Sequence, residues 1–252
     1  MCMFFLCVLV TVIFSVLGLY IFKKIDTSPV RCEDHNAVVA ILVGVMSVFL
    51  GVMVSFLIVT AWGIYSKSQL ESQKEAQTIY ILYEVVRTLP DTEDAQALII
   101  AYLEYIIKVE FPAISKGEVP PTGEEFTQEI QRVLYDYVPE TPQETVLYQK
   151  SITLIDLIVD LRINRVVTST SGLNSLIWWI TIIDSLLIIV MSWFLACSGS
   201  FHYIVVVIIA IYVASGLFTT MILSNPFRGY SGLSSEPFEQ ALANIFEGDL
   251  IG

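Results

Sequence analysis

Residues 37–65 read AVVAILVGVMSVFLGVMVSFLIVTAWGIY, twenty-nine consecutive residues without a charged side chain. As an α-helix this stretch would be roughly 43 Å long at about 1.5 Å per residue, longer than the ~30 Å hydrocarbon core of a bilayer. It continues into residues 67–71 (KSQLE) with no helix-breaking residue between them. The pattern therefore predicts a membrane-spanning helix that leaves the bilayer and continues to Leu89, where Pro90 ends it.

The composition is typical of a membrane protein. Of 252 residues, 55% are hydrophobic and only 15% are charged, whereas an average soluble domain has about 25% charged residues. Four apolar runs, each long enough to span a bilayer, are nearly free of charges, at 1–22, 37–65, 173–197 and 201–223. The block between the second and third runs holds 17 of the 25 acids and nine of the 13 basic residues. The sequence predicts an all-α, multi-pass membrane protein with four transmembrane helices and one polar insert.

We expect the membrane helices at about 3–22, 37–65, 174–197 and 201–223. The chain would then consist of a transmembrane hairpin (1–66), a cytoplasmic helical insert (67–172), a second transmembrane hairpin (173–224) and a cytoplasmic tail (225–252). A signal peptide is the alternative interpretation of the first run. A retained helix is favoured, because the run lacks a basic start and no A-x-A cleavage site follows it.

Orientation follows from the lysines and arginines near the membrane ends. The side of the insert and tail carries ten basic residues, whereas the other side carries Lys23, Lys24 and Arg31. The excess predicts that the insert and both termini are cytoplasmic.

The insert is expected to be helical throughout, without strands or repeats. Asp91 or Thr92 would cap a helix that runs to about Phe111, and residues 112–123, rich in proline and glycine, would form a loop. Two capping boxes are predicted to begin the next two helices. They are Thr122 with Glu125, and Thr141 with Glu144. The last helix would end near Gly172, and Asn174 would cap the third transmembrane helix.

Small residues follow one face of the second transmembrane helix in steps of three and four. The face consists of Ala40, Gly44, Ser47, Gly51, Ser55, Ile58 and Trp62. Such a face usually packs closely against another membrane helix. It is alternatively the lining of a narrow pore, and both hold if copies of this helix pack round an axis.

Asp184 lies within the third apolar run, where an ionised carboxylate costs about 2.5–3.5 kcal/mol on insertion scales. An interhelical hydrogen bond to Thr181, Ser185 or Thr219 would satisfy it, and a place on an ion pathway is the alternative.

Arg162 and Arg165, just before the third run, have no acid three or four residues away. We interpret them as juxtamembrane basic residues unpaired on their own helix. Another helix, lipid phosphate or a passing anion would be their partner, or they extend toward the interface.

Signals of catalysis, cofactors and metals are poor. His35 and His202 lie far apart, and no HExxH, GxGxxG, P-loop or CxxC motif occurs. We expect no enzyme, no catalytic residue, no cofactor and no metal site, and the acidic insert argues against nucleic-acid binding. A disulfide between Cys32 and Cys197 is permitted, since both fall on the predicted outer side.

Three stretches together resemble the bestrophin-like family, specifically its small bacterial branch of unknown function. They are residues 75–117, which contain LPDTEDAQALIIAYLEYIIKVEFPAISKG, then LRINR at 161–165, and NPFRGYSGLSSEPFEQAL at 225–242. The last contains a turn like the family's Asn-Pro-Phe-Gly, formed here by Asn225, Pro226, Phe227 and Gly229, with Arg228 inserted. Residues 59–69 (VTAWGIYSKSQ) lack the family's Phe-Arg-Thr and Arg-Trp signatures.

The resemblance implies a four-helix protomer of a pentamer in the bacterial inner membrane. The second helix would line a central pore, and the insert would form a cytosolic vestibule. We therefore expect a homo-oligomeric ion channel whose partners are the lipid bilayer, its own copies and inorganic ions. The pore-lining candidates are Gly44, Ser47, Gly51, Ser55 and Ile58. The alternative is a non-conducting membrane scaffold or sensor whose helical insert binds a protein. A membrane hydrolase, the third class, lacks a nucleophile–base pair.

Overall fold

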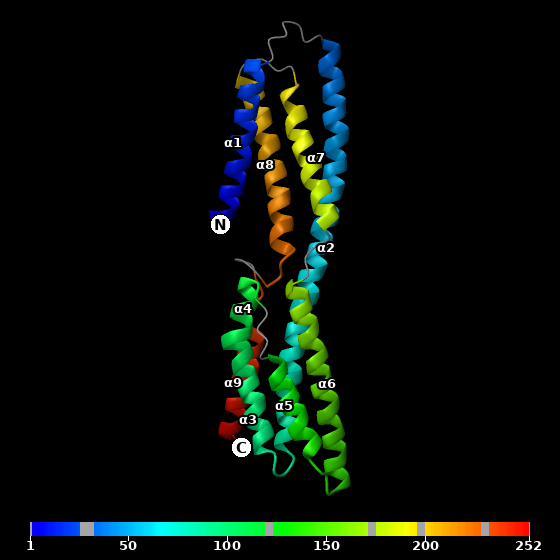
Figure 1. Cartoon of the computed structure of the whole chain (residues 1–252), viewed down its shortest axis with the longest axis vertical. Helices are drawn as coiled ribbons and strands as arrows, with labels where there is room; N and C mark the ends of the chain where they lie inside the picture. Colours follow the sequence, from blue (N-terminus) through cyan, green and yellow to red (C-terminus); the bar gives the residue numbers. More distant parts are fainter. Residues whose placement is uncertain are drawn as a thin grey trace. The chain divides into compact units, whose positions relative to one another are not determined.

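A computed structural model describes residues 2–25, 33–118, 123–170, 175–195, 200–227 and 232–251. Over these residues the chain is helical and contains no strand, so the all-α prediction is confirmed. The helices form two compact units. Unit 1 comprises Met1–Trp62 and Leu173–Ser224, and unit 2 comprises Gly63–Gly172 and Asn225–Gly252. Figure 1 labels the helices of both units.

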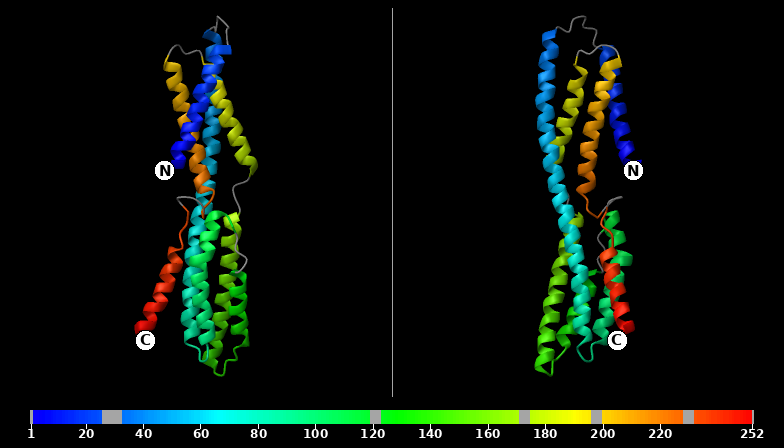
Figure 2. Two further views of the ribbon diagram at one scale, coloured as in Figure 1. Left: turned by 60° about the vertical axis from the view of Figure 1, so that its left-hand side comes forward. Right: turned by 180° about the vertical axis from the view of Figure 1, so that it is seen from behind.

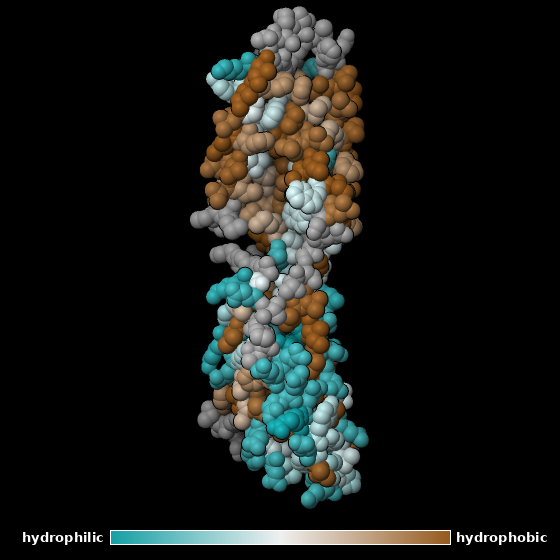
Figure 3. All heavy atoms as spheres, viewed as in Figure 1, coloured by the Kyte–Doolittle hydropathy of each residue, from teal (hydrophilic) through white to brown (hydrophobic). Residues whose placement is uncertain are grey.

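Unit 1 contains four helices that are long and apolar enough to cross a membrane, as the sequence predicts. They are α1 (Cys2–Ile25), the first part of α2 (Glu33–Arg87), α7 (Ser175–Trp193) and α8 (Ser200–Leu223). Figures 1 and 2 show α1 and α8 side by side. Leu50 of α2 packs against Ile188 of α7 and Val213 of α8. The visible surface of unit 1 is largely hydrophobic (Figure 3).

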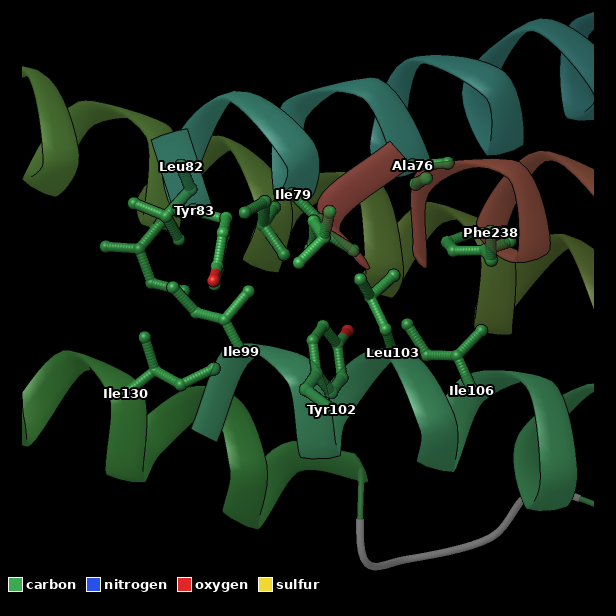
Figure 4. Close-up of a cluster of buried hydrophobic side chains, with 14 of the residues drawn as sticks. Ala76, Ile79, Leu82, Tyr83, Ile99, Tyr102, Leu103, Ile106, Ile130 and Phe238 are labelled. Atoms are coloured by element: carbon green, nitrogen blue, oxygen red, sulfur yellow. The ribbon is translucent and has the colours of Figure 1, made fainter. Parts of the chain in front are cut away.

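Unit 2 contains the remainder of α2 and the helices α3 (Glu93–Tyr105), α4 (Phe111–Lys116), α5 (Gly123–Asp136), α6 (Pro142–Thr170) and α9 (Glu236–Ile251). A π-helical turn, η1 (Ile106–Glu110), joins α3 to α4. Their apolar faces form a buried core. Figure 4 shows Ile79 and Leu82 of α2 facing Ile99 and Leu103 of α3, with Phe238 of α9 in the same cluster. The C-terminal segment therefore belongs to this core.

The expected start and stop signals operate at some of the described helix ends. The charge-free stretch and its polar continuation form one unbroken helix, α2, which ends at Arg87 shortly before Pro90. Thr92 precedes α3, but its hydroxyl donates to the carbonyls of Val86 and Leu89 rather than capping α3. The capping box at Thr141 is confirmed, since its Oγ1 accepts from the Glu144 N–H at 3.1 Å.

Two predicted boundaries are wrong. The helix expected to stop at Phe111 continues through Pro112 to Lys116. The cause is the wide turn of η1, in which the Phe111 N–H donates to the Ile106 carbonyl five residues back, so that Pro112 lies in the first turn of α4, at a position that needs no N–H. The third apolar helix, expected to reach residue 197, ends at Trp193 in a turn.

Several predictions fall outside the described residues. They are the helix break at Gly172, the caps at Thr122 and Asn174, the Cys32–Cys197 disulfide, the basic residue Arg31, and Arg228 and Gly229 of the tail motif.

Candidate functional site

The small-residue face of α2 is largely uncovered within the chain. The neighbouring face of the helix is the buried one, where Leu50, Leu57 and Ala61 are at most 2% exposed. By contrast, a Cβ added at Gly44 would meet no atom within 4 Å. Trp62, at the end of the same face, is 59% exposed. At Gly44 and Trp62 the face is therefore not packed closely against another helix of its own chain.

The middle of this face borders two adjoining grooves between α2 and α8. Gly51, Ser55 and Ile58 line one of about 270 Å³ together with Tyr212 and Thr219. Ser47 lines the other, of about 240 Å³, with Ile188 and Tyr212 among its neighbours. The Ser55 hydroxyl donates to the Gly51 carbonyl at 2.7 Å, along its own helix. The groove thus offers small side chains and oxygen lone pairs, with no nucleophile–base pair.

Asp184 of α7 is buried, with 9% of its surface exposed. Its Oδ2 has no hydrogen-bond partner among the described residues. The three hydroxyls expected to satisfy it, those of Thr181, Ser185 and Thr219, each donate to a carbonyl of their own helix. None of these three hydroxyls therefore donates a hydrogen bond to Asp184.

The two arginines without acids on their own helix find acids on other elements of unit 2. The Nε and a terminal nitrogen of Arg165 donate to the two carboxylate oxygens of Glu75 on α2, at 2.8 and 2.9 Å. Another nitrogen of Arg165 lies 3.3 Å from Oε1 of Glu110, and Nε of Arg162 lies 3.4 Å from the same oxygen. Of the partners considered for the two arginines, the structure shows acids on other helices. The arginines do not extend toward the membrane interface, because Arg162 is 8% exposed and Arg165 is 1% exposed.

These residues form a charge cluster, defined as Glu75, Glu110, Arg162 and Arg165. The guanidinium of Arg165 lies 5.3 Å from the ring centre of Phe111 and 5.4 Å from that of Phe238. Phe111 also contacts Phe227 of the predicted tail motif, with ring centres 6.1 Å apart. Aromatic faces attract a buried cation and exclude water from it. The cluster therefore ties α2, η1, α6 and α9 together.

Electrostatics within the cluster follow from its burial. Burial opposes the charge of Arg165, but Glu75 and Glu110 outweigh it and hold its pKa above the usual value. Burial raises the pKa of Glu75, and Arg165 offsets part of that rise. Burial, followed by the charge of Glu75, raises the pKa of the Tyr102 phenol, whose oxygen lies 3.5 Å from the carboxylate. The bidentate geometry is that of an ionised Arg–carboxylate pair.

The acids of the cluster are the residues that the sequence interpretation missed. Two arginines without local acids signal that partners exist elsewhere, but do not say where. An acid enclosed by apolar residues, as Glu110 is by Val109 and Phe111, is the corresponding signal. The direction of the Glu110 side chain depends on the π-helical turn, which regular helical spacing does not predict.

The described residues contain no group of three or more His, Cys, Asp or Glu side chains able to hold a metal ion. Cys7 is a free, partly buried thiol.

Comparison with known proteins gives a consistent picture. The family model of the bestrophin-like domain matches residues 9–238. A bacterial bestrophin homologue from Klebsiella pneumoniae superposes with a TM-score of 0.72 at 11% identity, over 96% of this chain and 97% of that chain. Two point mutants of that homologue give TM-scores of 0.72 and 0.73 at the same identity, each covering at least 96% of both chains. At this identity the structures show a shared fold. No curated protein matches the chain.

Proposed function

Because the chain belongs to the bestrophin-like family, whose members are known as ion channels, we propose that it is a homo-oligomeric ion channel. The proposed assembly is a pentamer. Each copy contributes α2 to a central pore, lined by Gly44, Ser47, Gly51, Ser55 and Ile58. Unit 2 and both termini are cytoplasmic in this proposal, and the membrane is the bacterial inner membrane.

The observation that carries the proposal is the uncovered small-residue face of α2. In a single chain Gly44 has open space beside it, while Leu50 on the neighbouring face is buried against α7 and α8. Helices anchored on one face in this way can converge through an adjacent face of small residues, which leaves a narrow passage. The bulky residues Leu42, Phe49 and Phe56 lie on a third face, where they are 45–58% exposed and suited to lipid.

The excess of acids in residues 66–172 supports a preference for cations over anions. Residues 66–172 contain 17 acids against nine basic residues, and a vestibule of that charge raises the local concentration of cations. We therefore propose that unit 2 favours cation entry, to be tested by exchanging the cation and then the anion of the flux buffer.

The test combines mass and flux. Mass measurement in a native-like membrane should give a pentamer, and the purified protein should pass ions across liposomes. Gly51→Trp should abolish the flux, whereas the matched variant Leu42→Trp, at a 45% exposed position on the third face of the same helix, should keep it. A monomer, or an intact oligomer without flux, would contradict the proposal.

A second candidate function is a non-conducting scaffold or sensor that binds a protein through unit 2. One observation favours it. A groove of about 500 Å³ between α2 and α9 is lined by four carboxamide side chains, Gln73, Gln77, Gln240 and Asn244. Carboxamides both donate and accept hydrogen bonds, as a peptide backbone does. Under this candidate the protein would be a monomer or dimer, and Gln77→Arg would weaken partner capture without affecting the mass.

A further inference from the structure

Asp184 occupies the centre of an apolar helix, nine residues from each end of α7 (Ser175–Trp193). Its side chain is more than nine-tenths buried, and Oδ2 receives no hydrogen bond from any described residue. An ionisable group in such a place requires a partner, a proton or water.

Nearby hydroxyls do not supply the partner. Thr181 donates to the Ile177 carbonyl and Ser185 donates to the Thr181 carbonyl, at 2.8 and 2.7 Å. On α8, Thr220 donates to the Gly216 carbonyl. Each hydroxyl hydrogen is therefore used within its own helix.

Charged and titratable groups on the elements around α7 do not supply it either. On α1 they are Cys2, Cys7, Tyr20, Lys23 and Lys24, and on α8 they are His202, Tyr203 and Tyr212. From Ala37 to Trp62, the part of α2 in unit 1 has none.

Two basic side chains on α1 and α8 contact groups near the C-terminal end of α7. The Lys23 ammonium lies 4.6 Å from the ring centre of Tyr203, at the start of α8. The neighbouring His202 contacts the Ser192 carbonyl at 3.0 Å. Ser192 is eight residues beyond Asp184, about 12 Å along the helix axis.

A metal ion is a poor occupant of this position. A divalent cation needs several oxygen ligands and commonly more than one carboxylate, and the described residues contain no group of three potential ligands. A proton needs a single oxygen. It converts the carboxylate into a neutral acid, which gains an O–H donor of the kind that Thr181 and Ser185 use toward the carbonyls of their own helix.

We propose that Asp184 is a proton-binding site of unit 1. The carboxylate takes one proton from the aqueous phase and holds it as a carboxylic acid in the folded protein at neutral pH, and the proton leaves when water reaches the side chain. The proposal does not require that the protein conducts ions, so it stands or fails separately from the proposed function.

Reaction with a hydrophobic carbodiimide tests the proposal. A carboxylic acid transfers its proton to a carbodiimide nitrogen while its oxygen bonds to the central carbon, and the adduct rearranges to a stable N-acylurea. Full-length protein in liposomes is treated with dicyclohexylcarbodiimide at neutral and alkaline pH, and peptide mass spectrometry locates the adduct. We expect modification at Asp184 that falls at least tenfold at alkaline pH and is absent in Asp184→Asn. A water-soluble carbodiimide should modify exposed acids such as Glu129 and spare Asp184.

An infrared difference spectrum provides the second measurement, since Asp184→Asn should remove a carboxylic-acid carbonyl band present at neutral pH. The proposal is overturned if this band is missing, or if both carbodiimides modify Asp184 equally. Either result would mean an ionised, solvated or cation-paired side chain.

Discussion

The two units of this chain treat buried charge in opposite ways. Unit 2 buries two acids and two arginines together, so that every ionised group of its charge cluster lies within 3.4 Å of an opposite charge. Unit 1 buries one acid, Asp184, without such a pair. Burying a charge is costly in both environments, and pairing or neutralisation is the way to reduce that cost. Unit 2 shows pairing, and neutralisation of Asp184 by a proton is what we propose for unit 1.

The surfaces of the two units differ as well, being apolar in unit 1 and polar in unit 2. Large apolar side chains are exposed over the helices of unit 1, with Val45, Val48 and Val59 all at least 65% exposed, while the visible surface of unit 2 is mostly hydrophilic (Figure 3). A lipid-facing unit gains little from a hydrophobic core, because the lipid is as apolar as the core. Unit 2 therefore depends on its core and its ion pairs for stability, and substitutions there should have the larger effects on unfolding.

The largest effect is expected from Arg165→Met. It leaves Glu75 without its bidentate partner and Glu110 with Arg162 alone. Removing one partner of a buried pair typically costs about 3–5 kcal/mol. Urea unfolding of the full-length protein in detergent micelles, followed by hydrogen exchange at the amides of α3 and α6, measures the loss in unit 2.

Two variants decide the interpretation of that loss. Arg132→Met removes an exposed arginine paired with Glu129 and should leave unfolding unchanged. The double variant Glu75→Leu with Arg165→Met removes both charges of the buried pair, so it should be more stable than Arg165→Met alone. If the double variant were the less stable of the two, the unpaired carboxylate would not be the cause of the loss.

The difference between the units also explains what the sequence predicts well. Helices in lipid have one requirement, a long apolar run, and composition alone located the four helices of unit 1. Their ends were less accurate, as at Trp193, because an apolar run does not state where the chain turns.

Unit 2 was harder to predict because its key contacts join distant parts of the chain. Ninety residues separate Glu75 from Arg165, and spacing along one helix carries no information about such a pair. The arginines were identified by their lack of local acids, whereas the acids were not. The π-helical turn that directs Glu110 into the cluster, and takes Pro112 into a helix, departs from the regular period on which the prediction rested.

A smaller effect is expected at Gly123, the first residue of α5. A Cβ there would overlap a terminal nitrogen of Arg162 and lie 2.7 Å from Oε2 of Glu110. Overpacking of this kind costs about 1–3 kcal/mol, so Gly123→Ala should destabilise unit 2 in the same urea experiment. The matched control is Gly63→Ala in α2, where a Cβ meets nothing within 4 Å, and alanine should add up to about 1 kcal/mol of helix stability. Equal effects of the two substitutions would disprove the tight fit around the charge cluster.

The smallest effect concerns an exposed charge of unit 2, for contrast with the buried ones. The Glu140 N–H donates to Glu144 at 2.7 Å, and this bond, with that from the Thr141 hydroxyl, holds the pKa of Glu144 below its usual value. A lowered pKa means that the ionised form stabilises the fold above the ordinary glutamate value, and that this contribution disappears as the pH falls through the lowered one. Glu144→Gln keeps a capping side chain without the charge. The wild type should therefore unfold at a slightly higher urea concentration than the variant at neutral pH, and the two curves should converge in acid. A gap that persists after Glu144 is protonated would mean that the shape of the side chain, rather than its charge, stabilises the start of α6.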